Sequence, residues 1–257
     1  MKINLLDCTL RDGGYYNNWD FKIELINEYL KSMSRSGLEF VEIGFRSFEK
    51  NTYKGVCAYS KDEFLKELNI PKSLRIAVMV NASEIINHNK GDLIKNTKKF
   101  FLSKKKSKVE LVRIAAHYHE LNKVNLIIKT IKKLGYKVAL NLMQISERTE
   151  KEILEIKKFI PEKELDILYI ADSMGSLEIE KIKNIIFLIK KFWNKQIGVH
   201  THDNMSRAII NARVATNCGA SWVDSTVTGM GRGPGNAQTE YMVLEYKDSL
   251  KKNVNIL

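Results

Sequence analysis

The sequence predicts an α/β fold, a single (β/α)8 TIM barrel spanning residues 1–257. Eight short apolar segments alternate with amphipathic helical segments, as the strands and helices of such a barrel do. No low-complexity or Gly/Ser-rich linker divides the 257-residue chain, and such barrels typically have roughly 250 residues. Most polar residues of catalytic type follow the C-terminal ends of the apolar segments, where barrel enzymes carry their active sites.

The eight apolar segments are short and rich in β-branched or aliphatic residues, which is typical of buried parallel strands joined by helices. They comprise residues 3–7, 39–44, 75–80, 110–115, 137–142, 167–171, 196–200 and 222–226. An open doubly wound sheet is the alternative, but it usually carries a Gly-rich phosphate loop after its first strand. The residues from Arg11 to Tyr15 do not match that fingerprint, which favours the closed barrel.

Between the predicted strands, apolar residues recur at the spacing of an amphipathic helix. Residues 20–36 and 121–134 form two such segments, and a glycine follows each of them directly as a helix-stop residue. Residues 177–193 and 204–217 have the same pattern, so we expect helices there as well.

The chain is basic, with a formal net charge of +12. Lys, Ile and Asn are abundant throughout, and we attribute the charge to a genome-wide composition bias, not to a nucleic-acid partner. The densest basic stretch, residues 98–106, is expected to be a solvated helix end whose Phe100 and Phe101 face the core. We therefore expect no nucleic-acid partner.

No segment has the features of a membrane span or a secretory signal, because no apolar run reaches about 18 residues. The three cysteines, Cys8, Cys57 and Cys218, are odd in number and unpatterned, which indicates a reducing compartment without structural disulfides. The sequence therefore predicts a cytoplasmic protein with no membrane partner.

Polar residues gather where the predicted strands end, so the barrel would bring them to one rim. They are Arg11, Asp12, Glu42, Arg113, His117, Asn141, Asp172, Ser173, His200 and His202, followed by the loop 229–236. This coincidence is stronger evidence for an active site than any single residue is.

Three of these residues form a candidate metal site. His200 and His202 are two positions apart at the end of a strand, so their side chains should point the same way. Asp12 can reach them because only the eighth strand separates the first from the seventh in a closed barrel. Such a set suits Zn²⁺ or Co²⁺, and further oxygen ligands, such as the amide of Asn236, favour Mn²⁺ or Mg²⁺.

The loop 229–236 carries glycine at positions 229, 231, 233 and 235. Glycine permits positive φ and close backbone approach to a ligand. The same composition is typical of a flexible loop that closes the barrel, and Asn236 could cap a following helix. The spacing alone favours none of these interpretations.

Three segments resemble the signature motifs of the DRE-TIM metallolyases, or HMGL-like superfamily, and occur in that family's order. They are Asp7-Cys8-Thr9-Leu10-Arg11-Asp12-Gly13, His200-Thr201-His202-Asp203-Asn204 and the loop 229–236 with its continuation to Glu240. Within the superfamily, residues 112–117 and 171–175 are similar to the 4-hydroxy-2-oxovalerate aldolase catalytic domain. The acyl-CoA-dependent synthases usually carry Thr at the position of Ser173.

The resemblance implies a divalent-metal-dependent class II aldolase that cleaves or forms a 4-hydroxy-2-oxo acid through a pyruvate enolate. Its substrates would be a 2-oxo acid (pyruvate) and an aldehyde. Asp12, His200 and His202 would be metal ligands, with Asn236 as a fourth, and Arg11 would stabilise the enolate. The alternative is an acyl-CoA-dependent Claisen condensing enzyme or lyase, similar to isopropylmalate synthase or HMG-CoA lyase.

The proton carrier is left open by the sequence. Tyr15, His117 and a metal-bound water are the candidates for catalytic acid–base work. The similar aldolases typically carry a histidine at the position of Tyr15. Tyr15 could instead be a packed aromatic residue, and His117 a surface imidazole.

Glu42, Arg113 and Ser173 are candidate substrate-binding residues. Each also has a structural interpretation. Glu42 could anchor an arginine such as Arg46 or Arg113, and Arg113 could neutralise Glu42 or Asp172. Ser173 could cap the start of a helix.

Other functions and partners are less well supported. A Schiff-base aldolase needs an interior lysine at the C-terminal end of a strand, and Lys137 stands at the wrong end of its strand. The similar aldolases carry a longer C-terminal region that helps to form a channel to an aldehyde dehydrogenase. This chain ends at Leu257, so the resemblance does not extend to that partner. Homo-oligomerisation is left open.

Overall fold

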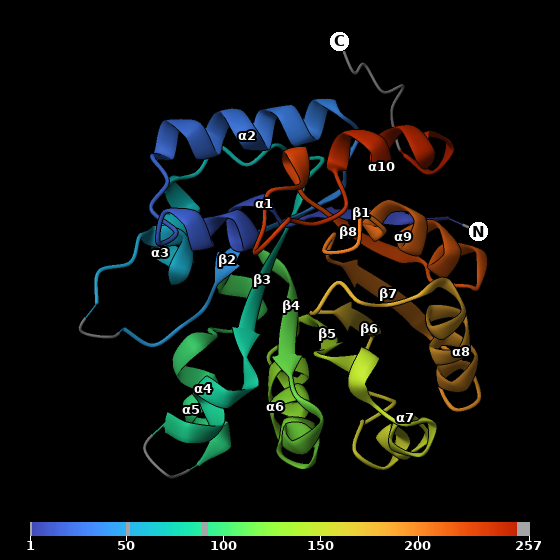
Figure 1. Ribbon diagram of the computed structural model, residues 1–257. Helices are drawn as coiled ribbons and strands as arrows, with labels where there is room; N and C mark the ends of the chain where they lie inside the picture. The colour runs from blue at the N-terminus through green and yellow to red at the C-terminus, as the bar shows by residue number, and fades with distance from the viewer. Residues whose placement is uncertain (1, 50–51, 89–91, 251–257) are drawn as a thin grey trace.

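The computed structural model describes residues 2–49, 52–88 and 92–250, and within them eight parallel strands close into a barrel (Figure 1). Each strand pairs with its neighbours in the sequence, and the last pairs with the first. The strands are β1 Asn4–Asp7, β2 Phe40–Phe45, β3 Arg75–Asn81, β4 Val109–Ala116, β5 Lys137–Leu142, β6 Ile167–Asp172, β7 Gln196–Thr201 and β8 Trp222–Ser225. The predicted (β/α)8 barrel is confirmed. The predicted domain span of 1–257 includes residues 251–257, which lie outside the described residues.

Ten α-helices of the described residues lie around the outside of the strands or cover their ends (Figure 1). They are α1 Thr9–Asp12, α2 Ile23–Arg35, α3 Asp62–Glu67, α4 Ala82–Asn87, α5 Leu93–Phe100, α6 Leu121–Lys133, α7 Glu150–Glu155, α8 Ile179–Lys190, α9 Ala208–Asn217 and α10 Thr239–Glu245. In this part of the chain, none is long and apolar enough to cross a membrane.

All four predicted helices are present and are shorter than their apolar spacing indicated. The helix expected over residues 204–217 begins only at Ala208, because the Asp203 carboxylate accepts a hydrogen bond from the Ala208 N–H at 2.8 Å and Ser206 has a φ of 52°. The helix expected over residues 177–193 begins at Ile179, where extended Glu178 precedes it. In both cases the local backbone conformation makes the helix begin later than the apolar pattern does.

The basic stretch 98–106 is a solvated helix end, as expected. Lys98 and Lys99 close α5 and are exposed, whereas Phe101 is buried and Phe100 packs against the core. The apolar sides of this segment thus stabilise the fold, and its lysines face water.

A small apolar cluster fills the inside of the barrel. Seven of the eight strands contribute side chains to it, and the cluster comprises Leu6, Cys8, Phe40, Ala77, Leu111, Ala139, Ile167, Tyr169 and Trp222. Strand β7 contributes Gly198 instead, and a Cβ there would lie 2.5 Å from the Tyr169 ring. The missing side chain therefore makes room for Tyr169. The cluster forms the floor of the barrel, so an active site would lie above it, at the C-terminal ends of the strands.

Gly198→Ala tests this packing. The added methyl group would push Tyr169 out of its place, and overpacking of this kind costs about 1–3 kcal/mol of unfolding free energy. Urea unfolding followed by circular dichroism measures the loss. Lys151→Ala, at an exposed position of α7, should stay within about 0.5 kcal/mol of the wild type. An unchanged midpoint for Gly198→Ala would contradict this account of the floor.

Candidate active site

A layer of polar side chains lies directly above the apolar floor. Side chains two positions apart on a strand point to the same face. Glu42, Arg113, His200 and Asp224 each come two positions after a floor position of their own strand, namely Phe40, Leu111, Gly198 and Trp222. All four side chains are buried. Strand register alone therefore places two acids, a guanidinium and an imidazole at one level inside the barrel.

The chain turns sharply into α1 where β1 ends, and this turn carries Arg11 and Asp12 over the barrel mouth. The Asp7 carboxylate fixes the turn, because it accepts hydrogen bonds from the Thr9 N–H and from the hydroxyls of Tyr29 and Thr239. The backbone N–H groups of Arg11 and Asp12 both donate to the carbonyl of Cys8.

Arg11 is held between two carboxylates. Its Nη1 lies 2.6 Å from Asp12 Oδ1, and its Nε lies 2.7 Å from Glu42 Oε2. Its third nitrogen, Nη2, is buried without a hydrogen-bond partner among the described residues. The guanidinium is therefore oriented firmly but keeps one donor free for another group.

His200 bridges Asp12 and a second acid, Asp224. Its Nε2 lies 3.3 Å from Asp12 Oδ2, and its Nδ1 lies 2.9 Å from Asp224 Oδ2. Asp224 was missed in the sequence analysis. The signal that could have found it is an acidic residue inside the predicted strand 222–226, two positions after Trp222.

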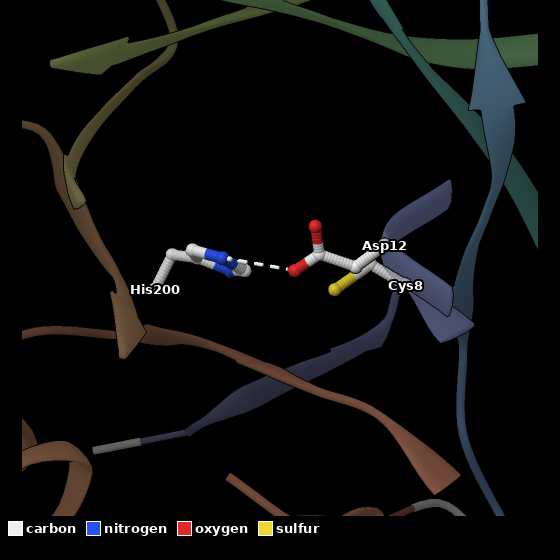
Figure 2. A group of neighbouring side chains, drawn as sticks. All are labelled: Cys8, Asp12 and His200. Carbon is white, nitrogen blue, oxygen red and sulfur yellow. Dashed lines mark ion pairs between the residues drawn. The ribbon is translucent and has the colours of Figure 1, made fainter. Parts of the chain in front are cut away.

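Donor atoms of Cys8, Asp12 and His200 lie within 4.8 Å of one another, as a shared metal ion requires. Figure 2 shows the Asp12 carboxylate and the Cys8 sulfur on the side that faces the His200 ring. Cys8 was not among the predicted ligands. Its Sγ contacts the Ser225 carbonyl at 3.5 Å, and burial raises the pKa of its thiol well above the ordinary value.

His202 and Asn236 adjoin this group. Strand β7 ends at Thr201, so His202 stands just beyond the strand, in an isolated bridge with Asn236, and its ring centre is 5.0 Å from that of His200. Asn236 Nδ2 donates to Asp12 Oδ2 at 2.6 Å, while Asn236 Oδ1 is buried without a partner. A carboxylate, imidazoles and an amide oxygen are donor types that suit a divalent cation, although His202 is not part of the Cys8, Asp12 and His200 group whose donor atoms lie within 4.8 Å.

The charges of the site are set by burial and by close partners. Burial alone would raise the pKa of Asp12, but the Arg11 charge and the hydrogen bond with His200 hold it far below its usual range. Burial also opposes the charged form of His200, yet hydrogen bonds with Asp12 and Asp224 raise its pKa. Burial, and then repulsion from His200, lowers the pKa of His202 to about 3. At neutral pH, Asp12 is a carboxylate and His202 a neutral imidazole, the forms that bind metal ions.

The Gly-rich loop forms a tight, hydrogen-bonded turn. The Asn236 N–H donates to the Gly229 carbonyl, and the Asp203 N–H donates to the Gly235 carbonyl. Gly235 has a φ of 98°, and a Cβ there would lie 2.0 Å from the Gly229 oxygen, so only glycine fits. Asn236 does not cap a helix, since α10 begins at Thr239 and the amide faces Asp12.

The sequence of the chain is similar to those of known proteins. The HMGL-like family model matches residues 2–256. The chain belongs to the HMGL-like family. Two similar proteins are 4-hydroxy-2-oxovalerate aldolases. The one from Carboxydothermus hydrogenoformans is 29% identical over 94% of this chain and 70% of its own length. The one from Geobacillus genomosp. 3 is 26% identical over 94% of this chain and 69% of its own length.

Solved structures agree with this membership. The N-terminal domain of a Bacteroides vulgatus protein classed as an aldolase superposes with a TM-score of 0.84 at 30% identity, covering 98% of this chain and 82% of that chain. The HMG-CoA lyase of Bacillus subtilis has a TM-score of 0.77 at 16% identity, covering 99% of this chain and 89% of that chain, and shows the shared fold alone. This HMGL-like protein is accordingly a carbon–carbon lyase of the aldolase type.

Tyr15 lies at the mouth of the HMGL-like site and is 43% exposed. Its ring packs edge-on against Trp19, with centres 4.7 Å apart, and the Arg232 guanidinium lies 5.1 Å from its centre. Because Arg232 belongs to the Gly-rich loop, Tyr15 links that loop to the turn after β1. Its role in proton transfer stays a prediction.

His117 and Ser173 follow β4 and β6, outside the Cys8–Asp12–His200 group. The half-buried His117 ring stacks with that of His119, with centres 5.6 Å apart. Ser173 Oγ accepts a hydrogen bond from the Gln144 N–H at 3.2 Å and caps no helix, because α8 begins at Ile179. The catalytic role of His117 and the substrate-binding role of Ser173 stay predictions.

The ion-pair alternatives are now resolved in part. Glu42 contacts Arg11 and Arg113, whereas Arg46 pairs with Asp62 at 2.8 Å. Arg113 contacts Glu42 and Asp224. Of the two alternatives for Arg113, Glu42 is confirmed and Asp172 is not, because the Asp172 carboxylate accepts from the backbone N–H groups of residues 176 and 177.

Tyr16→Phe tests how the loop is held. The Tyr16 hydroxyl donates to the Gly231 carbonyl at 2.5 Å, and losing one hydrogen bond costs about 1 kcal/mol, or about fivefold in local opening. We expect the Gly235 and Asn236 amides to exchange hydrogen about fivefold faster, measured by mass spectrometry. Tyr241→Phe, on the exposed side of α10, is the matched control. Equal exchange in both variants would show that Tyr16 does not hold the loop.

Proposed function

We propose that this HMGL-like enzyme is a divalent-metal-dependent class II aldolase, which cleaves or forms a 4-hydroxy-2-oxo acid through a pyruvate enolate. The observation that carries the proposal is the meeting of Asp12, His200 and Arg11 at one point above the barrel floor. A cation and a guanidinium side by side suit a reaction in which negative charge develops on oxygen. The named activity of the curated relatives supports the same reaction class.

Asp12, His200, His202 and Asn236 would hold the cation. When bound, it would supply Lewis acidity to the carboxylate and keto oxygens of the 2-oxo acid. The oxygen donors of Asp12 and Asn236 favour Mn²⁺ or Mg²⁺, and the imidazoles also suit Zn²⁺ or Co²⁺. Asn236 Oδ1 supports this assignment because it is buried and has no partner among the described residues.

Arg11 would bind the oxygen on which charge develops. Its Nη2 is the free donor, while Asp12 and Glu42 hold the rest of the guanidinium in place. A donor fixed before the reaction needs no rearrangement as the charge forms. Arg11 would therefore stabilise the enolate more than the starting 2-oxo acid.

Bond cleavage begins with loss of the proton from the hydroxyl on C4. The C3–C4 bond then breaks, the aldehyde leaves, and the electron pair remains as pyruvate enolate, which takes a proton on C3. Tyr15 is our proposed proton carrier, because it follows Asp12 closely in the chain and lies at the open mouth. His117 is the second candidate, and Ser173 would contact the substrate carboxylate.

Pyruvate release from a panel of 4-hydroxy-2-oxo acids tests the reaction. We expect release that depends on Mn²⁺ or Mg²⁺ and stops with excess chelator, measured by a coupled dehydrogenase assay. In deuterium oxide, the enzyme should also place deuterium in the methyl group of pyruvate, measured by NMR. Acetyl-CoA-dependent thiol release with a 2-oxo acid, without aldol cleavage, would instead indicate the Claisen alternative. Pyruvate release that is indifferent to chelator would contradict metal dependence.

Arg11→Ala and His200→Ala separate the guanidinium from the metal site. We expect Arg11→Ala to retain Mn²⁺ but to lose about 100- to 1000-fold in kcat, as enzymes do when one oxyanion donor is removed. His200→Ala should lose Mn²⁺ retention, measured by elemental analysis after gel filtration. His119→Ala, which removes an exposed imidazole, is the matched control and should keep both properties. Full turnover by Arg11→Ala would remove Arg11 from the mechanism.

A further inference from the structure

Two fully buried residues, Arg113 and Asp224, would act on the proposed cation and substrate only through other side chains. We propose that they are positioning residues, which orient Arg11 and His200 by completing a closed ring of six charged or ionisable side chains. The ring comprises Arg11, Glu42, Arg113, Asp224, His200 and Asp12, in the order of their contacts. The inference rests on the proposed function for the metal-binding role of His200.

On one side of the ring, a single carboxylate oxygen joins two arginines. Glu42 Oε2 lies 2.7 Å from Arg11 Nε and 3.2 Å from Arg113 Nη1. The Arg113 guanidinium also lies 4.3 Å from the centre of the Tyr169 ring, which belongs to the barrel floor. The floor thus fixes Arg113, and Arg113 fixes the carboxylate that orients Arg11.

On the other side, a single oxygen of Asp224 joins Arg113 to His200. Arg113 Nη2 donates to Asp224 Oδ2, and the same oxygen lies 2.9 Å from His200 Nδ1. This contact leaves His200 Nε2 directed at Asp12, 3.3 Å from Oδ2. Histidines that bind metal ions commonly present their other nitrogen to a carboxylate, which fixes the tautomer and the ring orientation.

Contacts, and not burial, separate positioning from direct contact, because Asp12 is also completely buried and His200 is 5% exposed. Arg113 reaches Arg11 only through Glu42, and Asp224 contacts the His200 nitrogen that faces away from Asp12. A purely structural ion pair is the competing explanation. Replacing a buried ion pair by apolar residues is often neutral or stabilising, whereas removing one partner is destabilising. Stability and site function can therefore be tested separately.

The experiment measures the Mn²⁺ dissociation constant by electron paramagnetic resonance, kcat and KM for pyruvate release, and the unfolding midpoint. Asp224→Ala should weaken Mn²⁺ binding about 10- to 100-fold, as loss of such a carboxylate does elsewhere. Asp224→Asn should lose less, because its amide oxygen can still accept from Nδ1–H. The double variant R113M/D224L should regain stability relative to Asp224→Ala, yet still bind Mn²⁺ weakly.

Asp62→Ala is the matched control, because it also removes a buried carboxylate from an arginine, Arg46, but outside the ring. It should lower the unfolding midpoint and leave Mn²⁺ binding and KM unchanged. Mn²⁺ affinity and kcat within twofold of the wild type in both Asp224 variants would overturn the proposal. Recovery of affinity together with stability in the double variant would do the same.

The two proposals fail in different ways. A wild-type protein that binds Mn²⁺ but releases no pyruvate would contradict the proposed aldolase reaction, while the affinities of the Asp224 variants still decide the positioning role. A wild-type protein that binds no Mn²⁺ would overturn both, because His200 would then have no ion to hold.

Discussion

The pairing of the Arg11 guanidinium with Asp12 and Glu42 is the interaction on which the site depends. All three groups are buried, and a charge removed from water is tolerated only when partners and hydrogen bonds compensate it. Arg11 keeps Asp12 ionised, and Asp12 in turn contacts His200 and Asn236. Loss of the guanidinium would therefore remove one donor and also the charge that holds the pKa of Asp12 below its usual range.

The alternation of side chains along the strands explains how one barrel holds an apolar floor and a charged layer. A step of two residues along a strand moves from Phe40 to Glu42, or from Trp222 to Asp224, on the same inner face. Gly198 admits the Tyr169 ring to the floor, and that ring supports Arg113 in the layer above. The stability of the floor and the geometry of the site are thus coupled through a few direct contacts.

The fold could be predicted from the sequence because strand and helix periods are local, and Asp12 and His200 followed from the strand order. The site was less predictable where contacts join distant positions. Asp224 and its partner Arg113 are 111 positions apart, and the residues around either one do not indicate that the two pair. His202 leaves the strand because its backbone pairs with Asn236, a contact that spacing does not reveal. Cys8, in contrast, lies two residues after Leu6, so the alternation of side chains along a strand could have placed it inside the barrel.

Two atoms beside Asp12, unpaired among the described residues, indicate the chemistry of a ligand that would suit the site. Arg11, bound to Asp12 Oδ1, has a free Nη2 donor, and Asn236, bound to Oδ2, has a free Oδ1 acceptor. A buried polar group without a partner costs about 1–3 kcal/mol, so such atoms are expected where a ligand completes the hydrogen bonding. The donor matches an anionic oxygen and the acceptor matches a cation. A cation and an anion bound together satisfy both atoms at once, and a chelated 2-oxo acid is a ligand of that kind.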